Sequence, residues 1–231
     1  MLNGIKILII LTSHATIGQH GQPTGVWFEE LTTPYYAFID AGAQVELASI
    51  QGGIVPVDPH SKAEGHRPAS VERFMQDSAA MQKLTHSSKV DQLDVAGYAA
   101  VFLPGGHGTM WDLPTSQPLA DLLGKAWAEG KVLSAVCHGP AGLTAVKDTN
   151  GQPLVAGRRV SAFTNSEEIQ AGMDKTVPFA LETRLKALGA HYEKGPDFQP
   201  YAVRDGKLIT SQNPASSAKV AQLVIDALQG K

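Results

Sequence analysis

The sequence predicts an α/β fold, a flavodoxin-like, doubly wound and mostly parallel sheet with helices on both faces. Short apolar runs rich in β-branched residues alternate along the chain with amphipathic segments of helical period. Glycine-rich and polar stretches follow several of these runs, as expected of loops at one edge of a sheet. The 231 residues contain no repeat, charged tail or low-complexity linker, so we expect one domain over residues 1–231.

The first third of the chain predicts a strand, a helix and a second strand. The apolar residues 5–11 form the first strand, and the polar residues 13–23 form a loop over its carboxyl end. A helix then begins at residues 24–31, and Pro34 should kink or reset it before it continues to Gly42. Residues 44–49 alternate in polarity and complete the unit as a strand.

An irregular segment interrupts the alternation after the second strand. Residues 50–68 carry six glycines and prolines, and residues 71–84 have the pattern of a surface helix. We interpret residues 50–84 as a small cap insertion. Two alternatives remain open for it, a lid over the active face and a surface insertion without a role.

The second half continues with alternating strands and helices. Strands are predicted at residues 98–103, 131–136, 160–163 and 191–193, with a hairpin at 201–210; helices are predicted at 116–129 (closed by Gly130), from the turn after Cys137 to about Lys147, at 177–188 and at 215–228.

The stretch from Lys131 to Leu143 carries the strongest functional signal. Its apolar run stops at Cys137, the only cysteine, and small residues then open a helix. Strand, sharp turn and helix are the geometry of a nucleophile elbow, and a helix N-terminus with a nearby imidazole lowers a thiol pKa from about 8.5. His138 follows directly, but adjacent side chains on a turn rarely face each other. We therefore expect its backbone N–H, as an oxyanion donor, to matter more than its ring.

A second glycine-rich turn follows the strand at residues 98–103. Gly105-Gly106-His107-Gly108 leaves backbone N–H groups unshielded and able to bind a developing oxyanion. No Gly-Lys-Ser/Thr ending follows, which argues against a phosphate loop.

Several acidic residues are candidate partners of the thiol. Glu30 follows Trp27 and Phe28 in the first helix, where burial would raise its pKa, although an exposed acid beside Glu29 has the same spacing. Glu167 and Glu168 follow a strand and could orient His138, or could simply favour a helix start. The pair His191 and Glu193 is a weaker rival, since a polar edge strand gives the same pattern.

The composition restricts partners and location. The chain is 43% hydrophobic and 18% charged with a net charge of −3, which gives no reason to expect nucleic acid or an anionic membrane as a partner. One cysteine makes no internal disulfide, which suits a reducing compartment. Lys6 interrupts the apolar start, unlike a signal peptide, and no run approaches the ~20 apolar residues of a membrane span. We expect a cytoplasmic protein.

The histidines outside the motifs above lack paired metal-ligand spacing, so we expect no metal site. They are His14, His20, His60, His66 and His86.

Residues Ala135 to Pro140, with Cys137 and His138 at their centre, resemble the DJ-1/PfpI superfamily within the class I glutamine-amidotransferase-like fold. Further segments are similar to the Hsp31-type branch and occur in the same order over almost the whole chain. They are Thr24-Gly25-Val26 leading to Glu30, Gly106-His107-Gly108-Thr109 with Asp112 and Pro114, Phe163-Thr164 leading to Glu168, and Asn213-Pro214-Ala215-Ser216.

The resemblance implies a role for each matching residue. It implies Cys137 as nucleophile, His138 as its partner, Glu30 as the acid that contacts the thiol, Glu168 as triad acid with Glu167 as competitor, Gly106 with the His138 N–H as oxyanion site, and His107 and Trp111 as residues of the substrate pocket.

The implied activity is that of a cofactor-independent glyoxalase III (D-lactate dehydratase type), which converts methylglyoxal or a similar 2-oxoaldehyde to a 2-hydroxy acid such as lactate without glutathione. The resemblance also implies two alternatives, a stress-response holdase that binds unfolded chains and a deglycase of glycated proteins. The Cys137 nucleophile by itself leaves a further alternative open, a Cys-dependent amidase, esterase or peptidase that acts on small substrates. Oxidation sensing by an exposed thiol is a further possibility. A homodimer is expected. Fold alone fixes none of these activities.

Overall fold

The computed structural model describes residues 1–18 and 20–231 and contains a central sheet of seven strands. These strands are β1 (Lys6–Leu11), β4 (Gln44–Ser49), β5 (Ser88–Lys89), β6 (Ala100–Leu103), β7 (Val132–Val136), β10 (Ala202–Asp205) and β11 (Leu208–Ser211). Their order across the sheet is β10-β11-β7-β6-β1-β4-β5, and only β10 pairs antiparallel with its neighbour. The mostly parallel sheet confirms the predicted fold class.

Strand β1 lies near the middle of the sheet, and its side chains alternate between two hydrophobic cores. Ile7 and Ile9 belong to one core and Leu8 and Ile10 to the other, and all four are fully buried. A strand buried on both faces appears in the sequence as a continuous apolar run, which is why residues 5–11 predicted it.

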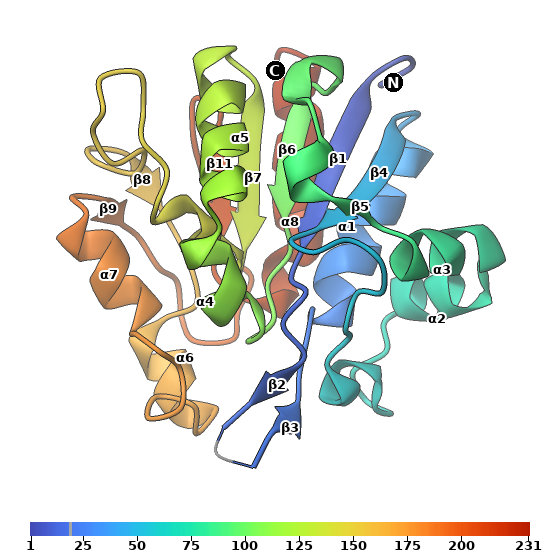
Figure 1. Cartoon of the computed structure of the whole chain (residues 1–231), viewed down its shortest axis with the longest axis vertical. Coiled ribbons are helices and arrows are strands. Elements are labelled where there is room, and N and C mark those ends of the chain that lie inside the picture. Colours follow the sequence, from blue (N-terminus) through green and yellow to red (C-terminus); the bar gives the residue numbers. More distant parts are fainter. Residues whose placement is uncertain (19) are drawn as a thin grey trace.

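Helices cover both faces of the sheet (Figure 1). The long helices are α1 (Phe28–Asp40), α5 (Gln117–Ala128) and α8 (Ser217–Leu228). α1 packs against α8 in the first core, and α2 (Ala69–Gln76) and α3 (Ser78–Thr85) extend that core beside α1. α5 packs in the second core on the opposite face.

The remaining elements are short. They are β2 (Thr16–Ile17), β3 (Gln22–Pro23), β8 (Arg159–Val160), β9 (His191–Tyr192), α4 (Thr109–Asp112), α6 (Asn165–Gln170), α7 (Leu181–Ala187) and the 3-10 helices η1 (Pro59–Lys62), η2 (Val90–Gln92), η3 (Val95–Gly97), η4 (Leu113–Thr115), η5 (Gly139–Leu143) and η6 (Pro214–Ser216). β2 and β3 pair within the predicted loop 13–23, of which Gln19 lies outside the described residues.

The structure corrects several predicted elements in the first half. The first helix begins at Phe28, later than the predicted Thr24, and its assignment runs through Pro34 without a break. The single helix predicted at residues 71–84 is two helices, because Asp77 leaves helical geometry and caps α3 by accepting a hydrogen bond from the Ala80 N–H.

Three predictions in the second half are also wrong. The helix after Cys137 is only the 3-10 helix η5, which contains Gly139, Pro140 and Gly142. The strand predicted at 160–163 is the two-residue β8, which pairs with β9 outside the main sheet. The helix predicted at 177–188 is confined to α7.

The chain order of the strands creates a switch point beside β1. The chain passes from β1 outward to β4 and β5 and then returns to β6 on the other side of β1. Ligands in open α/β sheets bind outside the carboxyl ends of the strands at such a point. This edge is the lower one in Figure 1, where β6 and β7 end.

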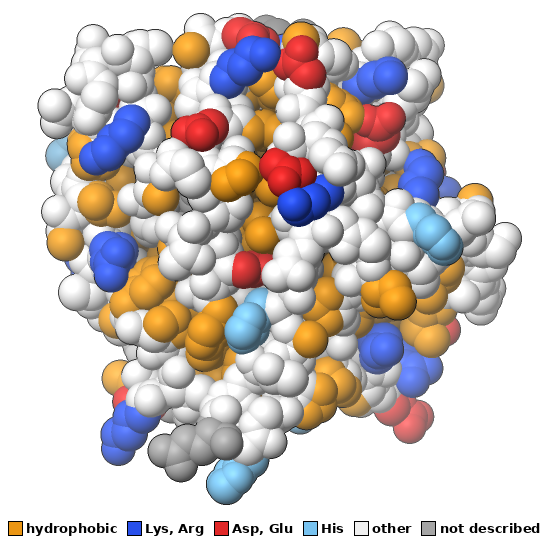
Figure 2. All heavy atoms as spheres, viewed as in Figure 1, with side chains coloured by type: hydrophobic (Ala, Val, Ile, Leu, Met, Phe, Trp, Pro, Cys, Tyr) orange, Lys and Arg blue, Asp and Glu red, His pale blue; other side chains and the backbone are white. Residues whose placement is uncertain are grey.

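The surface shown in Figure 2 carries Lys and Arg side chains interspersed with Asp and Glu and with apolar groups. Among residues 1–18 and 20–231, no helix combines the length and apolar character needed to cross a membrane.

Candidate active site

Cys137 lies at the carboxyl end of β7 in a left-handed backbone conformation, with φ of 59°. Two hydrogen bonds fix it, since its N–H donates to the Ser211 carbonyl and its carbonyl accepts from the Phe163 N–H, both at 2.9 Å. A β-carbon at Gly139 would lie 2.1 Å from the Leu103 carbonyl oxygen, so the turn needs glycine there. The local geometry is that of a nucleophile elbow.

The His138 ring faces the thiol, with Nδ1 only 3.2 Å from Cys137 Sγ. The expectation that these adjacent side chains turn away from each other is therefore wrong. The positive φ of Cys137 departs from the geometry of an ordinary turn, and that strain accompanies the close approach of the two side chains. The other ring nitrogen of His138, Nε2, lies 2.7 Å from Glu168 Oε2.

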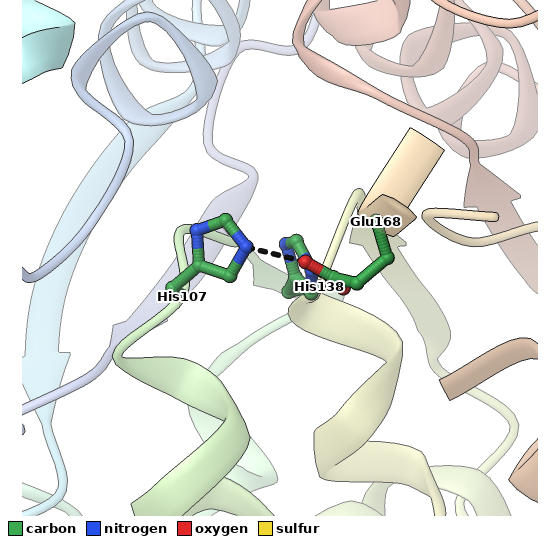
Figure 3. A group of neighbouring side chains, drawn as sticks. All are labelled: His107, His138 and Glu168. Carbon is green, nitrogen blue, oxygen red and sulfur yellow. Dashed lines mark hydrogen bonds and ion pairs between the residues drawn. The ribbon is translucent and has the colours of Figure 1, made fainter. Parts of the chain in front are cut away.

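Glu168 lies between two histidines (Figure 3). Its Oε1 atom is 2.7 Å from His107 Nε2, so each carboxylate oxygen contacts one imidazole. Burial opposes ionisation of Glu168, but its electrostatic interaction with His138 and its hydrogen bonds with both rings hold its pKa well below the usual range. Burial lowers the pKa of His138, which makes its neutral form with Nε2–H directed at Glu168 the stable one.

The same three side chains have donor atoms within 4.8 Å of one another and so form the candidate for a metal site. Their 2.7 Å separations are those of charge-assisted hydrogen bonds, and both oxygens of Glu168 are already engaged. The donor set therefore fits a hydrogen-bonded relay better than a metal centre.

Glu30 approaches Cys137 from the first turn of α1 and is fully buried, so the alternative of an exposed acid is wrong. Its Oε2 atom accepts a hydrogen bond from the Gly105 N–H at 2.6 Å. Within the described part of the chain Oε1 has no hydrogen-bond partner of ordinary geometry, and the carboxyl contacts the Cys137 thiol. Burial raises the pKa of Glu30 to about 8, in spite of the contacts with Cys137 and Gly105, so the carboxyl is protonated at neutral pH.

The Cys137 thiol does not have the lowered pKa expected from the sequence. Burial and the neighbouring Glu30 carboxyl raise its pKa instead. At neutral pH the resting site thus holds a thiol, a neutral His138 ring and a neutral Glu30 carboxyl, and its ionised carboxylate is Glu168.

The side chains of Glu30, Cys137 and His138 line one cavity of about 430 Å³. Its polar groups come from Glu29, Glu30, His66, Gly106, His107, Cys137, His138 and Asn213, and its apolar walls from Trp27, Phe163, Ala171, Phe198, Pro214 and Ala215. His66 belongs to the segment 50–84 and contacts the Trp27 ring edge-on at 5.7 Å. That segment therefore contributes to the cavity wall.

Of two residues expected in the site, Gly106 lines the cavity and Trp111 does not. Gly106 lines the cavity, and in the described chain neither its backbone N–H nor that of His138 has a hydrogen-bond partner. Trp111 lies outside the cavity and stacks on His14 with ring centroids 5.3 Å apart. Its expected place in the pocket is wrong, and the tryptophan in the wall is Trp27.

The neighbours Glu167 and Glu168 have separate contacts. Glu167 forms a capping box with Thr164 at the start of α6, which points its carboxylate away from the histidines. The other candidate pair was His191 and Glu193. Glu193 binds Arg159 and Tyr201 instead of a residue of the Cys137 site.

A model of the DJ-1/PfpI family matches residues 24–227, which is most of the chain. The chain belongs to the DJ-1/PfpI family. Its similarity to the glutathione-independent glyoxalase HSP31 of Saccharomyces cerevisiae is 33% identity, over 97% of this chain and 98% of that protein. Such full-length similarity places it in the Hsp31-type branch of the family.

Two solved structures have the same fold. The Rapid Encystment Protein 24 kDa of Francisella tularensis is 36% identical, with a TM-score of 0.93 over 97% of this chain and 99% of that one. Glyoxalase III of Candida albicans is 30% identical, with a TM-score of 0.88 over 97% and 98%.

The sequence did not indicate two features of this DJ-1/PfpI site. The contact between His107 and Glu168 joins residues 61 positions apart, and no spacing rule connects them. Phe198 enters the wall from an irregular loop in which a lone aromatic residue carries no pattern.

Proposed function

We propose that this protein is a glutathione-independent glyoxalase that converts methylglyoxal, or a similar 2-oxoaldehyde, to a 2-hydroxy acid. One observation carries the proposal: a thiol on an elbow lies between a neutral carboxyl and a neutral imidazole in a single cavity. An isomerising site needs a nucleophile together with a group that can both give and accept a proton at adjacent carbons. The activity named for full-length relatives agrees with this chemistry.

In the proposed first step, His138 Nδ1 accepts the thiol proton as Cys137 Sγ attacks the aldehyde carbon, C1. The C1 oxygen takes a proton from Glu30, giving a hemithioacetal. The N–H groups of Gly106 and His138 are the candidate donors to the oxygen while it is charged. Glu168 stabilises the imidazolium that forms on His138.

In the second step, the Glu30 carboxylate removes the C1 hydrogen as a proton, and the imidazolium protonates the C2 oxygen to give an enediol. Glu30 then delivers its proton to C2, while His138 takes the proton of the C1 hydroxyl, which leaves a thioester. Water then attacks this thioester and gives one proton to the Glu30 carboxylate, while the His138 imidazolium protonates the departing Cys137 sulfur. The 2-hydroxy acid is released, and the thiol, the neutral carboxyl and the neutral imidazole of the resting site are restored. The buried carboxyl suits this shuttle because its pKa of about 8 is close to working pH.

The test is an assay of lactate formed from methylglyoxal without glutathione, with both enantiomers measured. We expect turnover by the wild-type protein and none above background by Cys137→Ala or the near-isosteric Cys137→Ser. Since the chain has one cysteine, no other thiol can substitute. Lactate production that survives in Cys137→Ala would refute the mechanism.

A second candidate function is favoured by the alignment of Cys137, His138 and Glu168, which is also that of a Cys-dependent amidase or peptidase. Hydrolysis needs no proton transfer between neighbouring carbons, so it does not require Glu30. Full hydrolysis of small amide or ester substrates by Glu30→Gln, without lactate formation by the wild type, would favour this candidate.

A further inference from the structure

Phe198 has an unusual backbone conformation, with φ of 56°. Among the described residues, only Cys137 and Phe198 combine a side chain with a positive φ. Such a conformation costs free energy for a residue other than glycine, and it persists only where the surroundings impose it. The strain at Cys137 belongs to the nucleophile elbow, and the strain at Phe198 has no such explanation within the fold.

A buried carboxylate holds the strained backbone in place. The Phe198 N–H donates to Glu167 Oε1 at 2.7 Å. The same oxygen accepts hydrogen bonds from Gln212 Nε2 and Asn213 Nδ2, while Oε2 accepts from the Thr164 N–H. Glu167 is fully buried, so these donors replace the water it has lost.

The consequence of this clamp is the position of the Phe198 ring. The residue is 43% exposed and lines the cavity that contains Cys137. The Phe198 and Phe163 rings lie edge-to-face with their centroids 6.2 Å apart. Phe163 in turn packs on the His138 ring, with the two centroids 4.4 Å apart. A continuous aromatic wall therefore runs from the imidazole beside the nucleophile to the opening of the cavity.

This wall offers more contact than a three-carbon substrate can use. The cavity of about 430 Å³ is within the range of roughly 300–1,000 Å³ for pockets that enclose drug-sized ligands. With its aldehyde carbon at Cys137, methylglyoxal would place only a methyl group toward the wall. An aromatic substituent at C2 would extend along Phe163 to Phe198, where aromatic rings attract one another edge-to-face.

We propose that Phe198 is a specificity-determining residue, held in strain by Glu167 so that its ring selects 2-oxoaldehydes with a bulky apolar group on C2. This inference rests on the proposed function for its substrate class. The wall itself is testable without turnover, because it should also select among reagents that alkylate Cys137.

The experiment compares two pairs of probes on the wild type and variants. Methylglyoxal and phenylglyoxal are the substrate pair. Bromoacetone and phenacyl bromide are the matched alkylating pair, in which Cys137 Sγ bonds to the CH2 carbon, bromide leaves and the thiol proton passes to solvent. Mass spectrometry measures the alkylation rate at the single cysteine.

Phe198→Gly removes the ring and relieves the backbone. We expect its preference for the phenyl member of each pair to fall about fivefold, the worth of one aromatic contact. In turnover the change should appear in KM, since the Phe198 ring touches no reacting atom. The melting temperature should not decrease, because glycine adopts a positive φ without strain. Ile169→Ala, an exposed apolar residue of α6 outside the cavity, is the control and should keep the wild-type ratios.

Glu167→Gln tests the clamp with the ring still present. The amide can accept fewer of the four donors, so Phe198 should leave its position and the phenyl preference should fall as in Phe198→Gly. Wild-type ratios in Phe198→Gly for both pairs would overturn the inference. The variants could lose the preference for phenacyl bromide while the wild type forms no hydroxy acid. That result would support the role of Phe198 in selecting aromatic groups and would reject the proposed function.

Discussion

Glu30 contacts the Cys137 thiol and Glu168 contacts the His138 ring, and the ionisation states of these two glutamates are opposite. Glu30 on the α1 side receives one backbone N–H and has its pKa raised to about 8 by burial. Glu168 on the α6 side is also buried, but it lies between two imidazoles and its pKa is lowered. Burial alone therefore does not determine the charge of a carboxyl in this site. The charge depends on how many cationic or N–H groups contact the carboxyl.

The difference suits two separate tasks. A neutral Glu30 can give a proton to the substrate and take one back, whereas an ionised Glu168 can only orient and stabilise the His138 ring. Substitution of Glu30 should therefore impair proton transfer to and from the substrate, whereas substitution of Glu168 should impair the orientation and stabilisation of His138.

Among substitutions of Glu30, Glu168 and His107, Glu30→Gln should have the largest effect. The amide preserves size and polarity but cannot exchange a proton, so kcat for methylglyoxal should fall by about 10²- to 10⁴-fold. Alkylation of Cys137 should continue, since the thiol and His138 remain. Exposed Glu64 provides the control, and Glu64→Gln should keep the wild-type kcat. A Glu30→Gln protein with full glyoxalase activity would contradict the role of the shuttle.

The same substitution should stabilise the protein at alkaline pH. The unfolded carboxyl loses its proton near its usual pKa of 4.5 and the folded one only near 8, so wild-type stability falls as pH rises between these values. Gln cannot ionise, and Glu30→Gln should gain about 4–5 kcal/mol at pH 8.5 and little below pH 4.5. Urea unfolding at the two pH values measures this. Equal differences at both would contradict a raised pKa.

Glu168→Gln should lower kcat by about 10- to 100-fold, because the amide neither fixes the His138 tautomer nor stabilises the imidazolium. The lowered pKa of Glu168 means that its pairing stabilises the fold above the unfolded pKa and is lost as pH falls through the folded one. The stability difference from wild type should thus shrink in acid, opposite in sign to that of Glu30→Gln. A difference that grows in acid would refute the assignment.

His107 should show the smallest effect, as a positioning residue that acts through Glu168. His107→Ala removes one of the two N–H donors to the carboxylate and should reduce kcat about tenfold with little change in KM. His107→Gln can still donate an amide N–H and should recover most of the activity. Equal loss in both variants would instead indicate that the imidazole itself reacts.

The sequence predicted those parts of the molecule that depend on local pattern. Apolar runs located β1, β4 and β7, and the turn after β7 located Cys137 at the sheet edge. Glu30 could be suspected because two aromatic residues precede it and a buried helix face follows.

Contacts that depend on how distant or strained residues come together in the fold could not be predicted from local sequence patterns. The His138 ring faces the thiol at a residue with a positive φ, and the backbone N–H of Phe198, also at positive φ, donates to Glu167, 31 positions away. Trp27 and Trp111 follow glycine-rich segments of similar character, so sequence alone could not decide which one enters the cavity.

The most direct test of the opposite ionisation states is an infrared pH titration of the wild type against Glu30→Gln and Glu168→Gln. We expect the wild-type minus Glu30→Gln difference spectrum to contain a protonated carboxyl C=O stretch at neutral pH that disappears as pH rises through about 8. The corresponding difference for Glu168→Gln should show only carboxylate bands in the same range. A carboxylate signal from Glu30 at pH 6 to 7 would contradict the account.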